Sequence, residues 1–226
     1  MEHDLWNGLR LRIPEGEVPL GADSLLLADF LTLPPRARVA DLGAGCGTLG
    51  VLLCARDPSC TVAGIELRPE ACRAAQENVR INGLEERLTV LEGDVRRIRT
   101  LLPAGDFFCV IANPPYFPVG SGKAGRNSAV ARTEQCLTLA ELCAAAAWLL
   151  PPGGRFALVH RAERLCDLLC ALRVCGLEPK RLQLAAHALD RPPSLVLVEA
   201  VRQGRPGLEV LPALYRAGPG GREEGA

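Results

Sequence analysis

The order in which apolar and amphipathic stretches follow one another most constrains the fold of this chain. From Arg38 onward, apolar stretches typical of buried strands alternate about six times with stretches whose apolar residues recur at helical spacing. This alternation predicts a doubly wound α/β fold, with helices on both faces of a mostly parallel sheet. The expected strands are 38–42, 61–67, 87–94, 107–112, 155–160, 180–187 and 194–201, and the expected helices are 48–57, 69–82, 137–150 and 161–175.

The two ends of the chain depart from this alternation. No helical stretch separates the last two expected strands, so one of them should run antiparallel, at an edge of the sheet. Residues 1–20 predict a short strand or hairpin, and Asp23 or Ser24 can cap a helix that follows. We therefore divide the chain into an N-terminal extension (1–37), a central domain (38–205) and a Pro- and Gly-rich tail (206–226) whose end is expected to be disordered.

The amino-acid composition limits the cellular environment and the binding partners that we expect for this chain. The chain has 226 residues with a formal net charge of +0, so no global basic field attracts nucleic acid. Its 10 cysteines show no C-x-x-C spacing and its 3 histidines are scattered, which argues against a metal site and for buried free thiols in a reducing, cytoplasmic environment. The N-terminus lacks the apolar core of a signal peptide, and the longest apolar run is too short to span a membrane. We expect a soluble intracellular protein.

A glycine-rich motif ends the first sheet strand. The stretch "DLGAGCG" runs from Asp41 to Gly47, and its spaced glycines allow a tight turn and a close approach of a ligand to the backbone. Acidic residues end the next two strands, Glu66 and Asp94. In a parallel sheet these three strand ends meet at one edge, where nucleotides bind, so we expect Glu66 to accept hydrogen bonds from ribose hydroxyls and Asp94 or its neighbours to face an adenine.

The position of the first acidic residue distinguishes between nucleotides. A carboxylate before the glycines is unfavourable for a pyrophosphate but favourable for a ligand that carries an ammonium group. The pattern D-x-G-x-G-x-G resembles the first motif of class I S-adenosylmethionine-dependent methyltransferases. That resemblance implies a Rossmann-like fold and places Asp41 near the methionine end of the cofactor. The cofactor-binding residues that it implies are Asp23, Asp41, Gly43, Ala44, Gly45, Gly47, Glu66, Leu67, Gly93, Asp94, Val95 and Asn113.

A second motif, "NPPY", ends the fourth sheet strand at Asn113, Pro114, Pro115 and Tyr116. In the same superfamily this tetrapeptide marks enzymes that methylate a planar nitrogen, so these four residues are the expected catalytic residues. Such a nitrogen donates its lone pair to a π system and is a poor nucleophile. The Asn113 side-chain oxygen and the Pro114 carbonyl can hold its N–H groups and stabilise the positive charge that grows on it. The prolines fix the backbone, and Tyr116 can stack on a flipped base.

Longer stretches point to a narrower group. The stretches "GADSLLLADF", "NPPYF" and "LLPPGGRFALVHRAERL", in that order, resemble the tRNA1(Val) adenine-N6 methyltransferase-like family. The resemblance implies a seven-stranded sheet with an antiparallel edge strand and methylation of the purine just 3′ of a tRNA anticodon. RNA, as tRNA, is then the partner of a monomer or homodimer. The expected substrate-binding residues are Tyr116, Phe117, Lys123, Arg126 and Arg132, and the basic residues among them are candidates for phosphate contacts.

Four other functions remain open at this point. A glutamine-N5 protein methyltransferase shares this core but carries a helical domain before it, whereas only about 37 residues precede the first strand here. A guanine-N2 RNA methyltransferase often has a tandem half, and no repeat occurs in this sequence. A small-molecule methyltransferase could hold an amine with the same motif. A module that binds S-adenosylmethionine or RNA without turnover conflicts with the intact NPPY residues.

Overall fold

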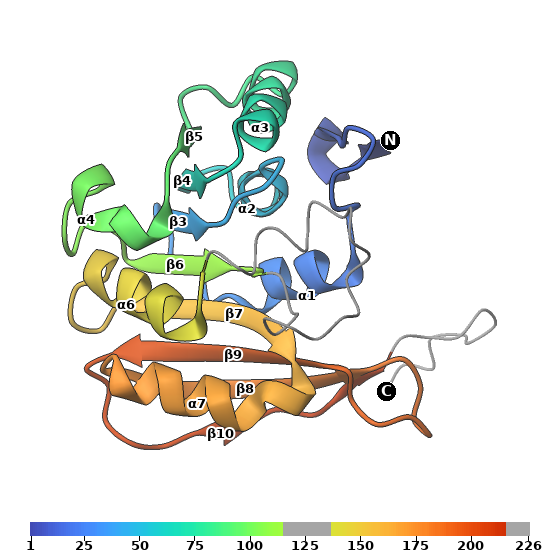
Figure 1. The fold of residues 1–226 in the computed structure, drawn as a ribbon. Coiled ribbons are helices and arrows are strands. Elements are labelled where there is room, and N and C mark those ends of the chain that lie inside the picture. The colour runs from blue at the N-terminus through green and yellow to red at the C-terminus, as the bar shows by residue number, and fades with distance from the viewer. Residues whose placement is uncertain (115–136, 216–226) are drawn as a thin grey trace.

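The computed structural model describes residues 1–114 and 137–215, which form a twisted sheet with helices on both faces (Figure 1). The strands are β1 (Glu2–Asp4), β2 (Arg10–Arg12), β3 (Arg38–Leu42), β4 (Thr61–Glu66), β5 (Leu88–Glu92), β6 (Cys109–Ala112), β7 (Arg155–Arg161), β8 (Leu177–Ala186), β9 (Leu195–Arg202), β10 (Glu209–Val210) and β11 (Leu214–Tyr215). The α-helices are α1 (Ala22–Phe30), α2 (Thr48–Arg56), α3 (Pro69–Ile81), α4 (Ile98–Leu101), α6 (Leu139–Leu149) and α7 (Leu165–Val174). Three single-turn 3₁₀ helices are η1 (Trp6–Gly8), η2 (Val95–Arg97) and η3 (Ala162–Arg164).

The main sheet has the predicted α/β character. Its strand order is β10-β8-β9-β7-β6-β3-β4-β5, and β11 also pairs with β8. The pairs β3–β4, β4–β5, β3–β6 and β6–β7 are parallel. The chain progresses outward from β3 to β5 in one direction and from β6 to β7 in the other, so the point at which the order reverses lies between β3 and β6. Ligands bind at the carboxyl ends of the strands at such a point.

Each face of the sheet has its own apolar core. Helices α1, α2 and α3 and the N-terminal hairpin pack on one face, and α4, α6 and α7 pack on the other. Strand β6 shows why both faces are needed, since all four of its residues are buried. A strand with no polar side chain is stable only when it is covered on both sides.

The prediction of an antiparallel edge strand was wrong about the edge. Strand β9 is antiparallel, but it lies inside the sheet, between β7 and β8. The crossover through α7 places β8 two positions from β7, and the chain then returns to fill the gap with the apolar strand β9. The two-residue strands β10 and β11 pair with the outer side of β8, so the sheet of described residues has nine strands rather than seven.

The first helix also begins differently from the prediction. Gly21, and neither Asp23 nor Ser24, is the N-cap of α1, and it makes no side-chain hydrogen bond. The helix therefore starts two residues earlier than a cap at Asp23 would allow. Both side chains lie in its first turn, where they face the carboxyl edge of the sheet.

Two asparagines attach the predicted N-terminal hairpin to α3. Asn78, which is fully buried, accepts a hydrogen bond from the Arg12 amide (2.8 Å) and donates to the Arg12 carbonyl (2.8 Å). Asn82 makes the same pair of bonds with Arg10, at 2.7 and 2.6 Å. These side chains satisfy the open edge of β2, which would otherwise expose unpaired backbone groups.

The cysteines follow the expectation only in part. Six of the nine in the described residues are buried free thiols, whereas Cys166 and Cys170 on α7 are exposed and Cys175 is half-buried. Over residues 1–114 and 137–215, no three His, Cys, Asp or Glu side chains come together as a metal site would require. Within the same residues, no helix is both long and apolar enough to cross a membrane. The domain boundaries at 38 and 205 stay a prediction.

Candidate active site

The glycine-rich turn connects β3 to α2 at the point where the sheet order reverses. Gly43 and Gly45 have φ values of +83° and +54°, and a Cβ atom added to either would meet no other atom within 4 Å. The backbone at these two positions therefore borders open space, in a conformation that side chains other than glycine rarely adopt. Strand β4 holds the turn in place, since the amides of Gly43 and Ala44 both donate hydrogen bonds to the Ile65 carbonyl, at 2.9 and 3.0 Å.

Asp41 carries an unusual carboxylate beneath this turn. Asp41 is 1% exposed, and neither of its carboxylate oxygens has a hydrogen-bond partner within the described residues. Burial, and secondarily the negative charge of Glu66, raise the pKa of Asp41 from 3.8 to about 7. A buried carboxylate without a donor is costly on its own. The site is thus suited to a ligand that brings a positive charge or donors to Asp41.

Glu66, at the end of β4, stabilises the same turn. Its two carboxylate oxygens accept hydrogen bonds from the amides of Gly45 (2.8 Å) and Arg68 (2.9 Å). The Arg68 guanidinium lies 3.5 Å from Glu66 but makes a shorter, two-bond ion pair with Glu17, at 2.8 and 2.6 Å. Glu17, from the segment before α1, therefore draws Arg68 away from Glu66, whose oxygens retain lone pairs for further donors.

The third acidic residue, Asp94, is already engaged. It caps η2 by accepting a hydrogen bond from the Arg96 amide (2.9 Å), and both of its oxygens accept hydrogen bonds from the Arg96 side chain. The Arg96 guanidinium lowers the pKa of Asp94. Of the other residues expected to bind the cofactor, Leu67 is 38% exposed and Val95 is buried. A Cβ atom added to Gly93 would lie 2.7 Å from the end of the Leu101 side chain. Leu67 thus offers an apolar surface next to Glu66.

Asn113 follows β6, the strand that pairs with β3 on the other side of the reversal point. Its side-chain amide donates a 3.0 Å hydrogen bond to the hydroxyl of Ser24 on α1. Ser24 is 8% exposed, so this contact is shielded from water. The bond fixes which end of the Asn113 amide faces α1 and leaves the carbonyl oxygen on the opposite end.

Ser24 is the functional candidate that the sequence did not reveal. The sequence suggested only a helix cap for it, and nothing in the local pattern relates it to a residue 89 positions away. Its neighbour Asp23 accepts a 2.9 Å hydrogen bond from the Ser24 amide, which stabilises the first turn of α1. The structure therefore brings Asp23, Ser24 and Asn113 to one edge of the sheet, together with Asp41 and Glu66.

Several expected site residues cannot be placed. Pro114 is half-buried beside Asn113. The rest of the NPPY motif and the expected substrate contacts lie outside the described residues, namely Pro115, Tyr116, Phe117, Lys123, Arg126 and Arg132. Their roles stay predictions.

Comparison with known proteins identifies related sequences. Residues 17–170 match the family model described as the methyltransferase small domain. A tRNA1(Val) (adenine(37)-N6)-methyltransferase from Porphyromonas gingivalis is 29% identical over 80% of this chain and 73% of its own length. An enzyme of the same name from Aeromonas hydrophila is 32% identical over 67% of this chain and 63% of its own length.

Comparison with solved structures supports the fold. A predicted O-methyltransferase from Agrobacterium tumefaciens superposes with a TM-score of 0.70 at 23% identity, over 89% of this chain and 92% of its own. Geranyl diphosphate methyltransferase in complex with S-adenosylmethionine superposes with a TM-score of 0.59 at 16% identity, over 80% of this chain and 84% of its own. At these identities the likeness concerns the fold alone.

Proposed function

The chain belongs to the methyltransferase small domain family, and from that premise we propose that it methylates the N6 amino group of an adenine in tRNA. Family membership makes it an S-adenosylmethionine-dependent methyltransferase. The proposal concerns the acceptor. Both curated relatives described above are named as adenine(37)-N6 methyltransferases of tRNA1(Val), and this favours an adenine next to the anticodon.

The observation that carries the proposal is the orientation of Asn113. Its amide nitrogen donates to the Ser24 hydroxyl at 3.0 Å, so its carbonyl oxygen, which is an acceptor, lies at the end of the amide opposite to α1. Pro114, directly after it, contributes a carbonyl oxygen and has no N–H group that would compete. Two acceptors side by side match the two N–H bonds of an exocyclic amino group.

The chemistry explains why two acceptors are needed. The amino nitrogen of adenine shares its lone pair with the ring and is therefore a weak nucleophile. Hydrogen bonds to Asn113 and Pro114 turn the lone pair out of conjugation and stabilise the positive charge that develops on nitrogen. When bound, S-adenosylmethionine supplies an electrophilic methyl group on its sulfonium. The nitrogen lone pair would form the new N–C bond while the bond between the methyl carbon and sulfur breaks and leaves its electron pair on sulfur. One amino proton would then leave to solvent, because an amide is too weak a base to keep it.

Two acidic side chains fit the cofactor. The carboxylate of Asp41 lacks a hydrogen-bond donor in the described residues and suits the ammonium group of the methionine moiety. Glu66 keeps lone pairs for the ribose hydroxyls. Because Asp94 is bound by Arg96, we assign contact with the adenine to the backbone of residues 93–95 and to Leu67 rather than to a free Asp94 carboxylate.

We place the reaction in the cytoplasm, where the free thiols of this chain stay reduced. The phosphate contacts are assigned to Lys123, Arg126 and Arg132, outside the described residues. A monomer or a homodimer is compatible with this proposal.

The test uses purified protein, S-adenosylmethionine labelled in its methyl group, and total tRNA. Nuclease digestion should release labelled N6-methyladenosine, and Asn113→Ala should lower kcat by about 10²–10³-fold. Labelled N2-methylguanosine, label in protein, or equal activity on free adenosine would each refute the proposal in favour of another acceptor. Binding of cofactor and tRNA without any transfer would indicate a non-catalytic module.

A further inference from the structure

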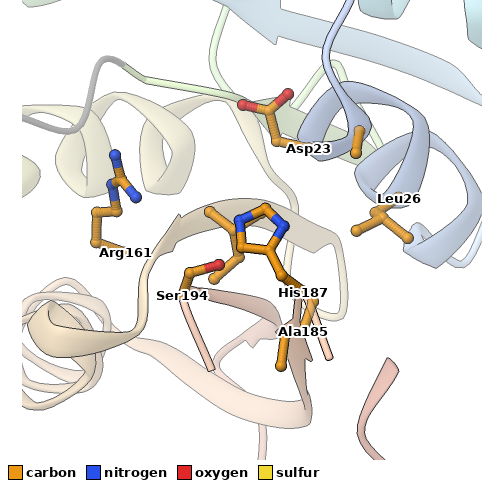
Figure 2. A pocket seen from close by; sticks show the side chains of 9 residues that line it. Asp23, Leu26, Arg161, Ala185, His187 and Ser194 are labelled. Atoms are coloured by element: carbon orange, nitrogen blue, oxygen red, sulfur yellow. The ribbon is translucent and has the colours of Figure 1, made fainter. Parts of the chain in front are cut away.

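A hollow of about 170 Å³ opens beside the candidate active site (Figure 2). It lies where three segments converge at the carboxyl edge of the sheet: the end of β7, the end of β8, and the start of β9. The first turn of α1 forms its remaining wall. The lining residues are Ala22, Asp23, Leu26, Arg161, Ala185, Ala186, His187, Ser194 and Leu195.

The hollow is adjacent to the residue that we expect to hold the target amino group. Asp23 lines it, and the next residue, Ser24, is the hydrogen-bond partner of Asn113. Arg161, on the other side, ends β7, the strand that pairs directly with β6. A group in the hollow would therefore lie at the end of β7, the strand next to the one that leads to Asn113 and its target base.

The size of the hollow suits one planar ring system. A dry cavity of about 150 Å³ is sufficient to bind benzene. Alanine and leucine side chains supply apolar walls, and the imidazole of His187 lies, in the view of Figure 2, between Arg161 and Leu26. An aromatic ring with apolar neighbours is the usual platform on which an unstacked base packs.

The polar groups around the hollow suit the rest of a nucleotide. The Arg161 guanidinium can bind a phosphate with two parallel hydrogen bonds. The Ser194 hydroxyl and the Asp23 carboxylate can accept hydrogen bonds from a ribose 2′-hydroxyl or from N–H groups of a base. Since Asp23 repels phosphate, the phosphate is directed toward the Arg161 side.

We propose that this hollow binds the nucleotide next to the methylated adenosine, with its base against His187 and its phosphate on Arg161. This inference rests on the proposed function, because it takes RNA as the substrate. It adds a second recognition site, which distinguishes an RNA chain from a free adenosine. A target adenosine held by Asn113 and a neighbour held in the hollow would then be bound separately rather than stacked on each other.

The test has two parts: one removes the neighbouring base from the RNA, and the other fills the hollow in the protein. Binding of anticodon stem-loop RNA is measured by fluorescence titration, with an abasic nucleotide placed 5′ or 3′ of the target adenosine. For the unmodified protein, one of the two abasic RNAs should bind about tenfold more weakly. In Ser194→Phe, whose larger side chain occupies the hollow, the intact and abasic RNAs should bind equally, because the two changes remove the same contact.

A second variant tests the same hollow without adding bulk to it, so the result does not depend on the folding of Ser194→Phe. Arg161→Gln should raise the KM for tRNA about tenfold and leave the Kd for S-adenosylmethionine within twofold. Its matched control is Arg173→Gln, which lies near the end of α7 in an exposed ion pair with Glu178 and should bind RNA normally. Thermal melting verifies that each variant is folded.

Three results separate the two proposals. If neither abasic RNA binds more weakly, or if the loss is as large in Ser194→Phe as in the unmodified protein, the hollow does not hold the neighbouring base. If both variants bind RNA and cofactor like the unmodified protein, the inference is likewise refuted. If the unmodified protein binds the RNA but makes no N6-methyladenosine, the proposed function fails, while the binding titrations still decide the role of the hollow.

Discussion

The buried carboxylate of Asp41 offers the sharpest test of the cofactor site. Asp41 is 1% exposed, and its pKa is raised from 3.8 to about 7 by burial and then by the charge of Glu66. We predict that Asp41→Asn makes the ligand-free protein more stable at neutral pH and at the same time abolishes binding of S-adenosylmethionine. The residue would then be retained for the ligand at the expense of stability.

The sign follows from proton binding. In the unfolded chain Asp41 ionises near pH 3.8, whereas in the folded protein it keeps its proton until about pH 7. The folded state therefore binds more protons in this interval, and its stability falls as the pH rises from about 4 to 7. Each pKa unit corresponds to 1.36 kcal/mol, so the gap of about three units amounts to about 4 kcal/mol. Asparagine does not ionise, so Asp41→Asn does not lose this stability as the pH rises.

A second buried group acts in the opposite direction. Burial, and then the charge of Arg164, lower the pKa of His160 from 6.5 to about 4. Its contribution to stability is therefore lost as the pH falls from 6.5 toward 4. The two effects partly cancel in the unmodified protein between pH 4 and 6.5. The quantity to measure is thus the difference between the unmodified protein and Asp41→Asn, in which the His160 contribution is common to both.

The assay is urea unfolding of ligand-free protein at pH 5, 6, 7 and 8. The free energy of unfolding of Asp41→Asn should gain about 3 kcal/mol on that of the unmodified protein between pH 5 and pH 7, and little more by pH 8. Asp29→Asn is the control, since it makes the same substitution at an exposed carboxylate on α1. A difference between the two proteins that does not depend on pH would refute the reasoning.

Three further predictions follow from contacts of the site. Ser24→Ala removes the hydroxyl that orients Asn113 and should lower kcat about tenfold, with the Kd for S-adenosylmethionine unchanged in calorimetry. Glu17→Gln weakens the ion pair that holds Arg68, which can then turn toward Glu66, so calorimetry should show cofactor binding weakened about fivefold. Asn78→Ala deprives three backbone groups of their partners and should lower the free energy of unfolding by about 3 kcal/mol in urea.

The variants Ser24→Ala and Glu17→Gln each have a control. Ser59→Ala removes a hydroxyl from an exposed turn and should leave kcat unchanged. Glu77→Gln disrupts an exposed ion pair with Arg80 and should not affect the cofactor. An unaltered kcat in Ser24→Ala, or unaltered cofactor binding in Glu17→Gln, would show that these contacts do not position the site. A loss below 1 kcal/mol in Asn78→Ala would show that water replaces its hydrogen bonds.

Much of the fold was predictable because its signals are local. The apolar stretch 107–112 and the amphipathic stretch 69–82 contain their periodicity within themselves, and the structure forms β6 and α3 there. Local sequence signals predicted the ends of helices and strands less well. The N-cap of α1 is Gly21, and the Ser24 hydroxyl accepts a hydrogen bond from Asn113 instead of capping the helix. The short helices η2 and α4 were missed, since they interrupt the strand-helix alternation with a single turn each.

By itself, the sequence determined the fold class, the glycine turn after Asp41 and the motif that starts at Asn113. These depend on residue types at short spacing, which impose the same backbone in any context. Only the tertiary structure decided that β9 lies inside the sheet, that Ser24 orients Asn113, and that Arg161 and His187 line one hollow. The order of strands in the sheet and the packing of α1 on it create these contacts between residues distant in the chain, and no local pattern encodes them.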